Sequence, residues 1–281
     1  MRRLILAAVF AFCASGALGQ SCWWCSQCGQ YHCGPRPSAP TQHDIDTSTE
    51  TAEEQDADAV SQRAVGVTRA RFSAQNEKIA DEVDQILDRL TARYGEPKVW
   101  KSFPVIFRPY TGNGVAGYTL YSDSVVKKVV VYESLENAIG GTLDHELTHA
   151  FFFYFLNSNF DLFLNEGVAQ NSEYRRREAL RQTVYRRYSS GEFWPIDKLY
   201  GRDSYDNSLL IYHEGFSVVD FLIGRGGSEW FAAFLWDLLQ TGNINDSLAR
   251  FYDYKTLSEL QVEWHKYINN GQDRKRVEAC N

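Results

Sequence analysis

The sequence lacks the features that define several common classes of protein. Beyond its N-terminus it has no apolar run of the length that a membrane span requires. It also has no recognisable phosphate-binding glycine-rich loop, no Ser/His/Asp set, and no internal repeat within residues 63–281. The formal net charge is −7, so the basic excess that indicates nucleic-acid binding is missing. We therefore expect no nucleic-acid partner, and no membrane span once the N-terminus has been processed.

The N-terminus has the pattern of an export signal. Arg2 and Arg3 precede an apolar run over residues 4–14, and small residues follow it before position 20. This pattern predicts a signal peptide over residues 1–19 that is cleaved, because the apolar run is too short for a spanning helix. An uncleaved N-terminal anchor is the alternative. We expect a secreted or periplasmic, extracytoplasmic location, where disulfides can form.

Cysteines are few, and most lie in one short stretch, residues 20–33. Their spacing suits either two disulfides or a tetrahedral zinc site, and export favours disulfides over zinc or an intermolecular or redox role. The pairing does not follow from the sequence, and a fifth cysteine near the C-terminus either finds a partner or stays free. The residues concerned are Cys22, Cys25, Cys28, Cys33 and Cys280.

The next segment, residues 34–62, is rich in Pro, Thr, Ser and acidic residues and has few large apolar side chains. Such a composition cannot bury enough surface to order itself, so we expect an acidic disordered linker. A folded domain is expected over residues 63–275, and the aromatic content of 14% supports a packed core. Whether residues 20–62 act as a removable prosegment stays open.

Within this domain the hydrophobic periodicity changes from strand-like to helical. An amphipathic helix is predicted at residues 66–93, ending before Gly95 and Pro97. Strands followed by helices indicate an α+β fold with a small, mostly antiparallel sheet and a mainly helical C-terminal part. The predicted strands are Val99–Phe107, Val115–Tyr121 and Val125–Tyr132, and the later helices are near 138–156, 163–189, 207–224, 228–240, 244–251 and 256–269.

The segment with the clearest chemical pattern is His145-Glu146-Leu-Thr-His149, in a predicted helix with apolar flanks. Residues four apart share one face of a helix, so both imidazoles can bind one zinc ion. Glu146 projects about 100° round the helix from His145, where it can reach a metal-bound water. The pattern predicts two metal ligands and a general base.

A third ligand is predicted at Glu166, because a catalytic zinc takes three protein ligands and leaves the fourth position for water. Glu166 lies seventeen residues after His149 in Leu164-Asn-Glu-Gly-Val168. This interval allows the first helix to end, the chain to turn near Asn157, and a second, antiparallel helix to begin. Glu173 is the best substitute ligand on the same predicted helix.

His-Glu-x-x-His followed by Asn-Glu-Gly resembles the gluzincin clan of zincin metallopeptidases, and more closely the peptidase MA-like family. The similarity extends over residues 99–269 and includes Leu209–Leu222. It implies a zincin-like fold with a metal-bearing helix, Zn²⁺ at His145, His149 and Glu166, and Glu146 as the base. It also places Tyr212 where the family carries a helix-borne tyrosine that faces the cleft.

The implied function is a zinc-dependent peptidase that hydrolyses peptide or protein substrates by attack of metal-activated water. Glu146 takes the proton of the water and passes it to the leaving amine. Tyr212, or its neighbour His213, donates a hydrogen bond to the oxyanion. Gln170 stands where a thermolysin-like pattern has an acid, so carboxylate support of a ligand histidine is not expected.

Two further features have more than one interpretation. In this interpretation an edge strand above the metal helix binds extended substrate by strand addition. Either Gly117–Tyr121 or Val129–Tyr132 is expected to be this strand. A basic helix could steer acidic substrates, although a solvated face is the better interpretation. Its arginines are Arg175, Arg176, Arg177, Arg181, Arg186 and Arg187.

Two rival hypotheses come from other functional classes. In the first, the chain is a catalytically inactive exported protein that keeps a zincin scaffold and uses its Cys/Trp-rich segment and cleft for binding. In the second, residues 22–33, with Trp23 and Trp24, are the active part of a cell-surface interaction module. The presence of Glu146 argues against the first. Retention of peptidase activity without residues 20–62 would argue against the second.

Overall fold

The fold was analysed in a computed structural model of the 281-residue chain. The residues that it describes are 12–14, 21–25, 30–33, 58–60, 74–97, 99–110, 115–122, 125–202, 205 and 208–279. These residues form two compact units, Met1–Leu90 with Pro97–Ser158, and Thr91–Glu96 with Asn159–Asn281. The first unit contains the sheets and the second is helical, which confirms the α+β class.

The main sheet of the first unit has four strands in the order β4-β5-β7-β6. Strand β6 forms an antiparallel hairpin with β7, whereas β5 pairs with β7 in parallel. The sheet is thus mixed, with two antiparallel pairings and one parallel pairing. The strands are β4 (Asp58–Val60), β5 (Pro104–Phe107), β6 (Gly117–Ser122) and β7 (Val125–Val131).

The strand order decides between the two expected edge strands. Val129–Val131 of β7 pair with β5 on one side and with β6 on the other, so this strand lies inside the sheet. The alternative that placed a substrate-binding edge at Val129–Tyr132 is therefore wrong. Strand β6 is the edge of the described sheet on that side, which leaves Gly117–Tyr121 as the candidate edge.

Three short strands near the N-terminus form a separate antiparallel sheet in the order β1-β2-β3. They are β1 (Phe12–Ala14), β2 (Ser21–Cys25) and β3 (Gln30–Cys33). Of the expected cysteine-rich segment, Cys28 lies outside the described residues, as does Cys280. Most of the expected linker, residues 34–57 and 61–62, also lies outside them. Asp58–Val60, within that linker, instead pair with β5 as strand β4.

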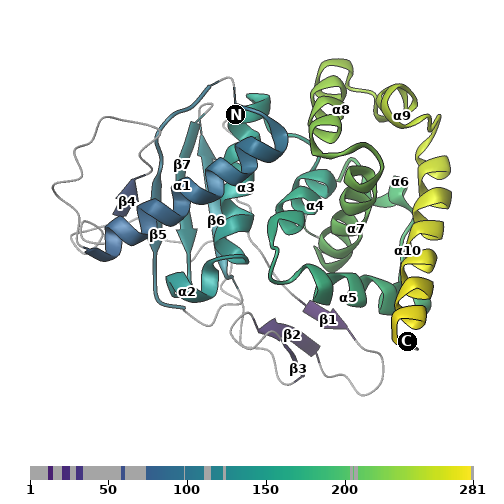
Figure 1. The fold of residues 1–281 in the computed structure, drawn as a ribbon, viewed down its shortest axis with the longest axis horizontal. Coiled ribbons are helices and arrows are strands. Elements are labelled where there is room, and N and C mark those ends of the chain that lie inside the picture. The colour runs from purple at the N-terminus through teal and green to yellow at the C-terminus, as the bar shows by residue number, and fades with distance from the viewer. Residues whose placement is uncertain are drawn as a thin grey trace. The chain divides into compact units, whose positions relative to one another are not determined.

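Three helices belong wholly or mostly to the first unit: α1 (Ala74–Tyr94), α2 (Leu135–Ala138) and α3 (Thr142–Leu156). Figure 1 shows them with the main sheet. Helix α1 buries Ile79, Val83, Leu87 and Leu90, the spacing of one apolar helix face. It ends as predicted at Gly95, which adopts φ 100° and donates its backbone N–H to Thr91.

Helix α3 packs against β6 and β7 and is buried on nearly every side. A row of aromatic residues, Phe151–Tyr154, fills its second half, stacks on Phe103 and Tyr121, and meets Trp100 edge-on. The helix ends at Asn157 in the left-handed conformation, φ 53°. The predicted turn near this residue is confirmed, and the polar first half of the helix lies beside β6.

The second unit is a set of helices around α7, which packs against α4, α5, α8, α9 and α10. The predicted helix over 163–189 is two helices, because the chain turns at Glu173–Arg176. The short helix α6, which begins after Pro195, was not predicted. The bounds are α4 (Leu162–Ser172), α5 (Arg177–Ser189), α6 (Ile196–Leu199), α7 (Ser208–Gly226), α8 (Ser228–Thr241), α9 (Ile244–Tyr252) and α10 (Leu257–Ala279).

Helices α4 and α7 approach each other through glycines. A Cβ atom added at Gly167 would lie 2.4 Å from the carbonyl oxygen of Gly215, and one added at Gly215 would lie 2.5 Å from the carbonyl oxygen of Phe163. Both contacts are with backbone, which cannot move aside as a side chain can. The crossing therefore requires the absence of a side chain at both positions.

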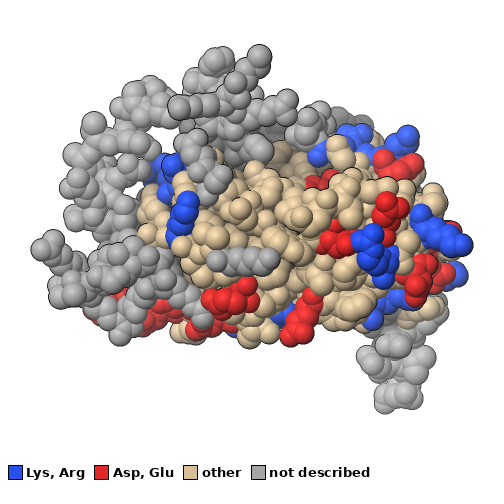
Figure 2. Space-filling model, turned by 90° about the horizontal axis from the view of Figure 1, so that it is seen from above, with Lys and Arg blue, Asp and Glu red and all other residues tan. Residues whose placement is uncertain are grey.

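No described helix is both long enough and apolar enough to cross a membrane. On the face of the molecule in Figure 2, acidic and basic side chains are interspersed.

The glycine crossing gives a matched pair of substitutions on α7. Gly215→Ala should lower the free energy of unfolding by about 1–3 kcal/mol or more, because the methyl group would force two backbones apart. Gly224→Ala lies on the same helix at an exposed position with no atom within 4 Å of the added Cβ. It should raise the stability by up to about 1 kcal/mol through helix propensity. Chemical denaturation of both variants tests this, and equal effects would contradict the close crossing.

Candidate metal centre

The two histidines of the predicted metal motif meet on α3. His145 and His149 are 3% and 2% exposed, and their Nε2 atoms lie 3.1 Å apart. Two nitrogens bound to one tetrahedral zinc ion, each at about 2.05 Å, would lie about 3.3 Å apart. The separation is therefore close to what a shared metal ion requires. A single hydrogen bond between one protonated and one unprotonated imidazole nitrogen has the same length.

The predicted base is held beside this pair by the edge strand. Thr119 on β6 is fully buried, and its Oγ1 lies 2.9 Å from Oε2 of Glu146 and 2.9 Å from the carbonyl oxygen of Glu146. A hydroxyl has one proton, so Thr119 donates to one of these oxygens at a time. The contact ties the side chain of Glu146 to β6 and limits its rotation.

The close approach of β6 to α3 depends on Gly117. A Cβ atom at this position would lie 2.8 Å from Cγ2 of Thr142 and 2.9 Å from the carbonyl oxygen of Val130. It would also lie 3.0 Å from Cγ of Glu146. Only glycine at this position lets β6 come close enough to α3 for Thr119, two residues after Gly117, to reach the carboxylate of Glu146.

A second buried acid, Asp144, lies next to the motif and is neutralised within the fold. Its Oδ1 accepts a hydrogen bond of 2.9 Å from Arg89 on α1, and its Oδ2 accepts one from the backbone N–H of Gly140. Asp144 lies in the first turn of α3, where a negative charge is also favoured by the helix dipole. With both oxygens engaged, Asp144 is a structural acid.

In the second unit, Glu166 is buried on α4, with 1% of its surface exposed. Its Oε1 accepts a hydrogen bond of 2.9 Å from the hydroxyl of Tyr205. The next residue, Gly167, makes the close crossing with α7. The two residues of the Asn-Glu-Gly segment thus have different contacts: Glu166 accepts a hydrogen bond, and Gly167 allows the close helix crossing.

The alternative ligand Glu173 and the neutral Gln170 both lie at the C-terminal end of α4. Glu173 ends α4 and forms an ion pair of 3.2 Å with Arg176. Gln170 has its Oε1 buried without a hydrogen-bond partner in the part of the chain described. The polar contact that Glu166 does make, with Tyr205, was not predicted from the sequence.

The two candidate oxyanion donors, Tyr212 and His213, are both buried on α7. The ring of Tyr212 stacks on that of Tyr205 with the centroids 6.3 Å apart. Burial, together with the smaller effects of the Arg187 and Arg186 charges, lowers the pKa of His213 to about 3. At neutral pH His213 is an uncharged imidazole, able to donate a hydrogen bond but not to deliver a proton as an acid.

The next residue on α7, Glu214, is buried in its neutral form. Burial raises its pKa to about 8, against the lowering effects of the Trp194 N–H, which donates a bond of 3.0 Å to Oε1, and of Arg187. Its Oε2 has no hydrogen-bond partner within the described residues. The cost of burying an ionised carboxylate here exceeds the stabilisation by its neighbours.

The basic helix α5 is not a uniform solvated face. Arg181 makes a two-pronged contact with the carboxylate of Asp220 on α7, with distances of 2.9–3.1 Å. Arg177 donates to the Asn171 side chain at 2.9 Å, and Arg93 donates to the same oxygen at 2.8 Å. Arg177 and Arg181 therefore make contacts within the second unit, and Arg181 stays exposed to solvent as expected.

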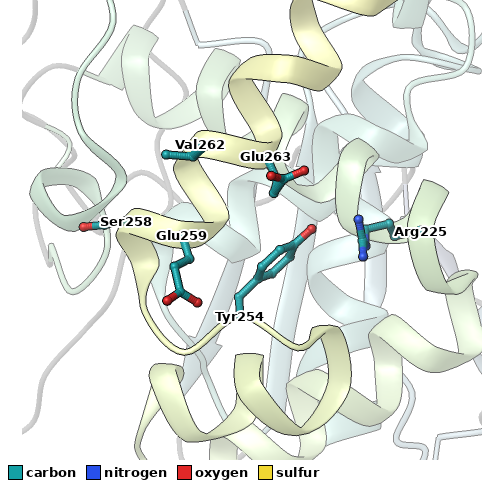
Figure 3. A pocket seen from close by; sticks show the side chains of 6 residues that line it. All are labelled: Arg225, Tyr254, Ser258, Glu259, Val262 and Glu263. Atoms are coloured by element: carbon teal, nitrogen blue, oxygen red, sulfur yellow. The ribbon is translucent and has the colours of Figure 1, made fainter.

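A shallow hollow of about 460 Å³ lies at the other end of α7. Figure 3 shows its lining, with the guanidinium of Arg225 near the ring of Tyr254, 5.2 Å from the ring centroid. Glu259 accepts a hydrogen bond from the backbone of Lys255, and Glu263 pairs with Lys266. Both carboxylates therefore have partners within the fold.

Comparison of the chain with protein-family models, with curated proteins and with solved structures gave no match. The functional interpretation therefore depends on the motifs of this sequence and on the geometry of their side chains.

The neutral state of Glu214 makes the stability of the protein depend on pH. Because its pKa is raised from 4.5 to about 8 in the folded state, the stability that it contributes is full below about pH 4.5 and is lost as the pH rises to about 8. Glu214→Gln keeps the shape and the acceptor for Trp194 but cannot ionise. The variant should match the wild type near pH 4.5 and be more stable by a few kcal/mol above pH 8.

Denaturation midpoints across this pH range test the prediction. Glu229→Gln, at an exposed position on α8, is the matched control and should leave the pH dependence unchanged. A parallel pH dependence in wild type and Glu214→Gln would show that Glu214 ionises in the folded protein.

Proposed function

We propose that the chain is a zinc-dependent peptidase with a zincin-like arrangement, in which His145 and His149 bind the metal and Glu146 is the general base. The observation that carries the proposal is the 3.1 Å separation of the two buried Nε2 atoms beside a buried carboxylate. Burying two imidazoles on an apolar helix is costly, and a metal ion bound to both would account for it.

Glu166 is the proposed third ligand. Together with His145 and His149 it makes a buried group of side chains that could hold a metal ion. Two histidines and one glutamate are a ligand set of catalytic zinc in peptidases, with one position left for water.

The residues divide the chemistry among them. Zinc, when bound, lowers the pKa of water and polarises the scissile carbonyl. Glu146, oriented by Thr119, takes the proton of the attacking water and gives it to the leaving amine. Tyr212 is the proposed hydrogen-bond donor to the oxyanion, with neutral His213 as the alternative. Strand β6, the edge next to α3, is the proposed binding strand for extended substrate.

Metal content distinguishes the ligands. In the full chain, elemental mass spectrometry should find one equivalent of zinc that is lost in His149→Ala and in Glu166→Ala, because two ligands do not hold zinc tightly. Glu173→Ala removes a carboxylate from the same helix and should retain that equivalent. If the zinc content is the same in both ligand variants as in the wild type, the zinc is bound elsewhere, as by the cysteines, and the support for a catalytic centre is lost.

The base is tested by Glu146→Gln, which is nearly isosteric. Zinc content should be unchanged, and the rate of peptide hydrolysis should fall by about 10²–10⁴-fold, because general-base catalysis is lost. Cleavage of a mixed peptide library, followed by mass spectrometry, measures this rate for many candidate substrate sequences at once. A residual rate near that of the wild type would reject the assigned base. Zinc binding without any hydrolysis by the wild type would favour the inactive-scaffold hypothesis.

A further inference from the structure

Tyr205 and Glu166 lie in different parts of the second unit, yet their side chains meet. We propose that Tyr205 is a positioning residue for Glu166, and that Asp161 anchors the connection that carries Tyr205. The inference rests on the proposed metal site, and it assigns a role to two residues outside both sequence motifs.

The contact itself is specific. The hydroxyl of Tyr205 donates to Oε1 of Glu166 at 2.9 Å, and Glu166 is 1% exposed. A hydrogen bond at one carboxylate oxygen restricts rotation of the group and so sets the direction of the other oxygen. Donors to ligand carboxylates act in this way at metal sites, and their loss lowers metal affinity by about 10–100-fold.

The ring of Tyr205 is held by a second contact. It stacks on Tyr212 of α7 with an angle of 22° between the ring planes. The hydroxyl direction therefore follows from α7, which also crosses α4 at Gly167 and Gly215. The helix that carries Glu166 and the ring that orients it are both positioned by the same neighbouring helix.

Asp161 links the same two segments through its carboxylate. Its Oδ1 accepts the backbone N–H of Leu164 and so caps α4, and its Oδ2 accepts the backbone N–H of Gly201 at 2.7 Å. Gly201 adopts φ 79° and lies four residues before Tyr205. One side chain therefore ties the start of the ligand helix to Gly201, which precedes the donor by four residues.

The test is the dissociation constant for zinc, measured on the full chain by competition with a chromophoric chelator. Tyr205→Phe keeps the ring stacked on Tyr212 and removes only the hydroxyl. It should weaken the zinc equivalent that depends on His149 by about 10–100-fold, with the thermal midpoint of the metal-free protein unchanged. Tyr188→Phe, on α5 against Phe193, is the matched control and should leave the zinc affinity at the wild-type value.

Asp161→Asn provides a second, independent variant. Asparagine still caps α4, but its amide N–H₂ replaces the acceptor of Gly201, so only the anchor of the connection is lost. Zinc affinity should fall, by a smaller factor than in Tyr205→Phe. The inference is overturned if the wild type binds zinc through His149 while both variants bind it equally well. If the wild type has no zinc that depends on His149, the proposed function fails and the role of Tyr205 fails with it.

Discussion

Ionisable groups are buried on one apolar helix of the first unit, and the contacts of its neighbouring elements depend on this burial. The first half of α3 carries Asp144, His145, Glu146 and His149, all less than 4% exposed. A buried charge without a partner costs several kcal/mol, so the surrounding elements have to supply partners. Helix α1 contributes an arginine to the aspartate, and β6 contributes a hydroxyl to the glutamate. The two imidazoles lie edge-on with their Nε2 atoms 3.1 Å apart, a separation that a shared metal ion would also give.

The second unit meets a similar constraint around Glu166, by a different route. There the close helix crossing at Gly167 and Gly215 leaves no room for side chains, and the polar partner comes from the connection before α7. Deeper in the unit, Asp220 is held by Arg181 and by the hydroxyl of Tyr267. Polar contacts between segments distant in sequence thus hold Glu166 and Asp220 in place, while apolar packing supplies most of the stabilisation.

The parts of this fold that follow from local patterns were predictable. The periodicity of α1, its end at Gly95 and the turn at Asn157 all came from residues adjacent in the sequence. The parallel pairing of β5 with β7 did not, because strand order depends on contacts between distant segments. The break between α4 and α5 has no glycine or proline to mark it. The motif histidines and glutamates were identified from spacing, whereas Thr119 and Tyr205 were missed because an isolated threonine or tyrosine carries no pattern.

The sequence of strand β7 bears on aggregation. Its sequence, Val-Val-Lys-Lys-Val-Val-Val, has the high β-propensity and low polarity at both ends that favour intermolecular strand stacking. In the folded chain its backbone is covered by β5 on one side and by β6 on the other, and Lys127 and Lys128 interrupt the valines. Loss of the β6–β7 hairpin would expose this strand first. The resistance of the protein to aggregation therefore depends on the same edge strand that orients Glu146.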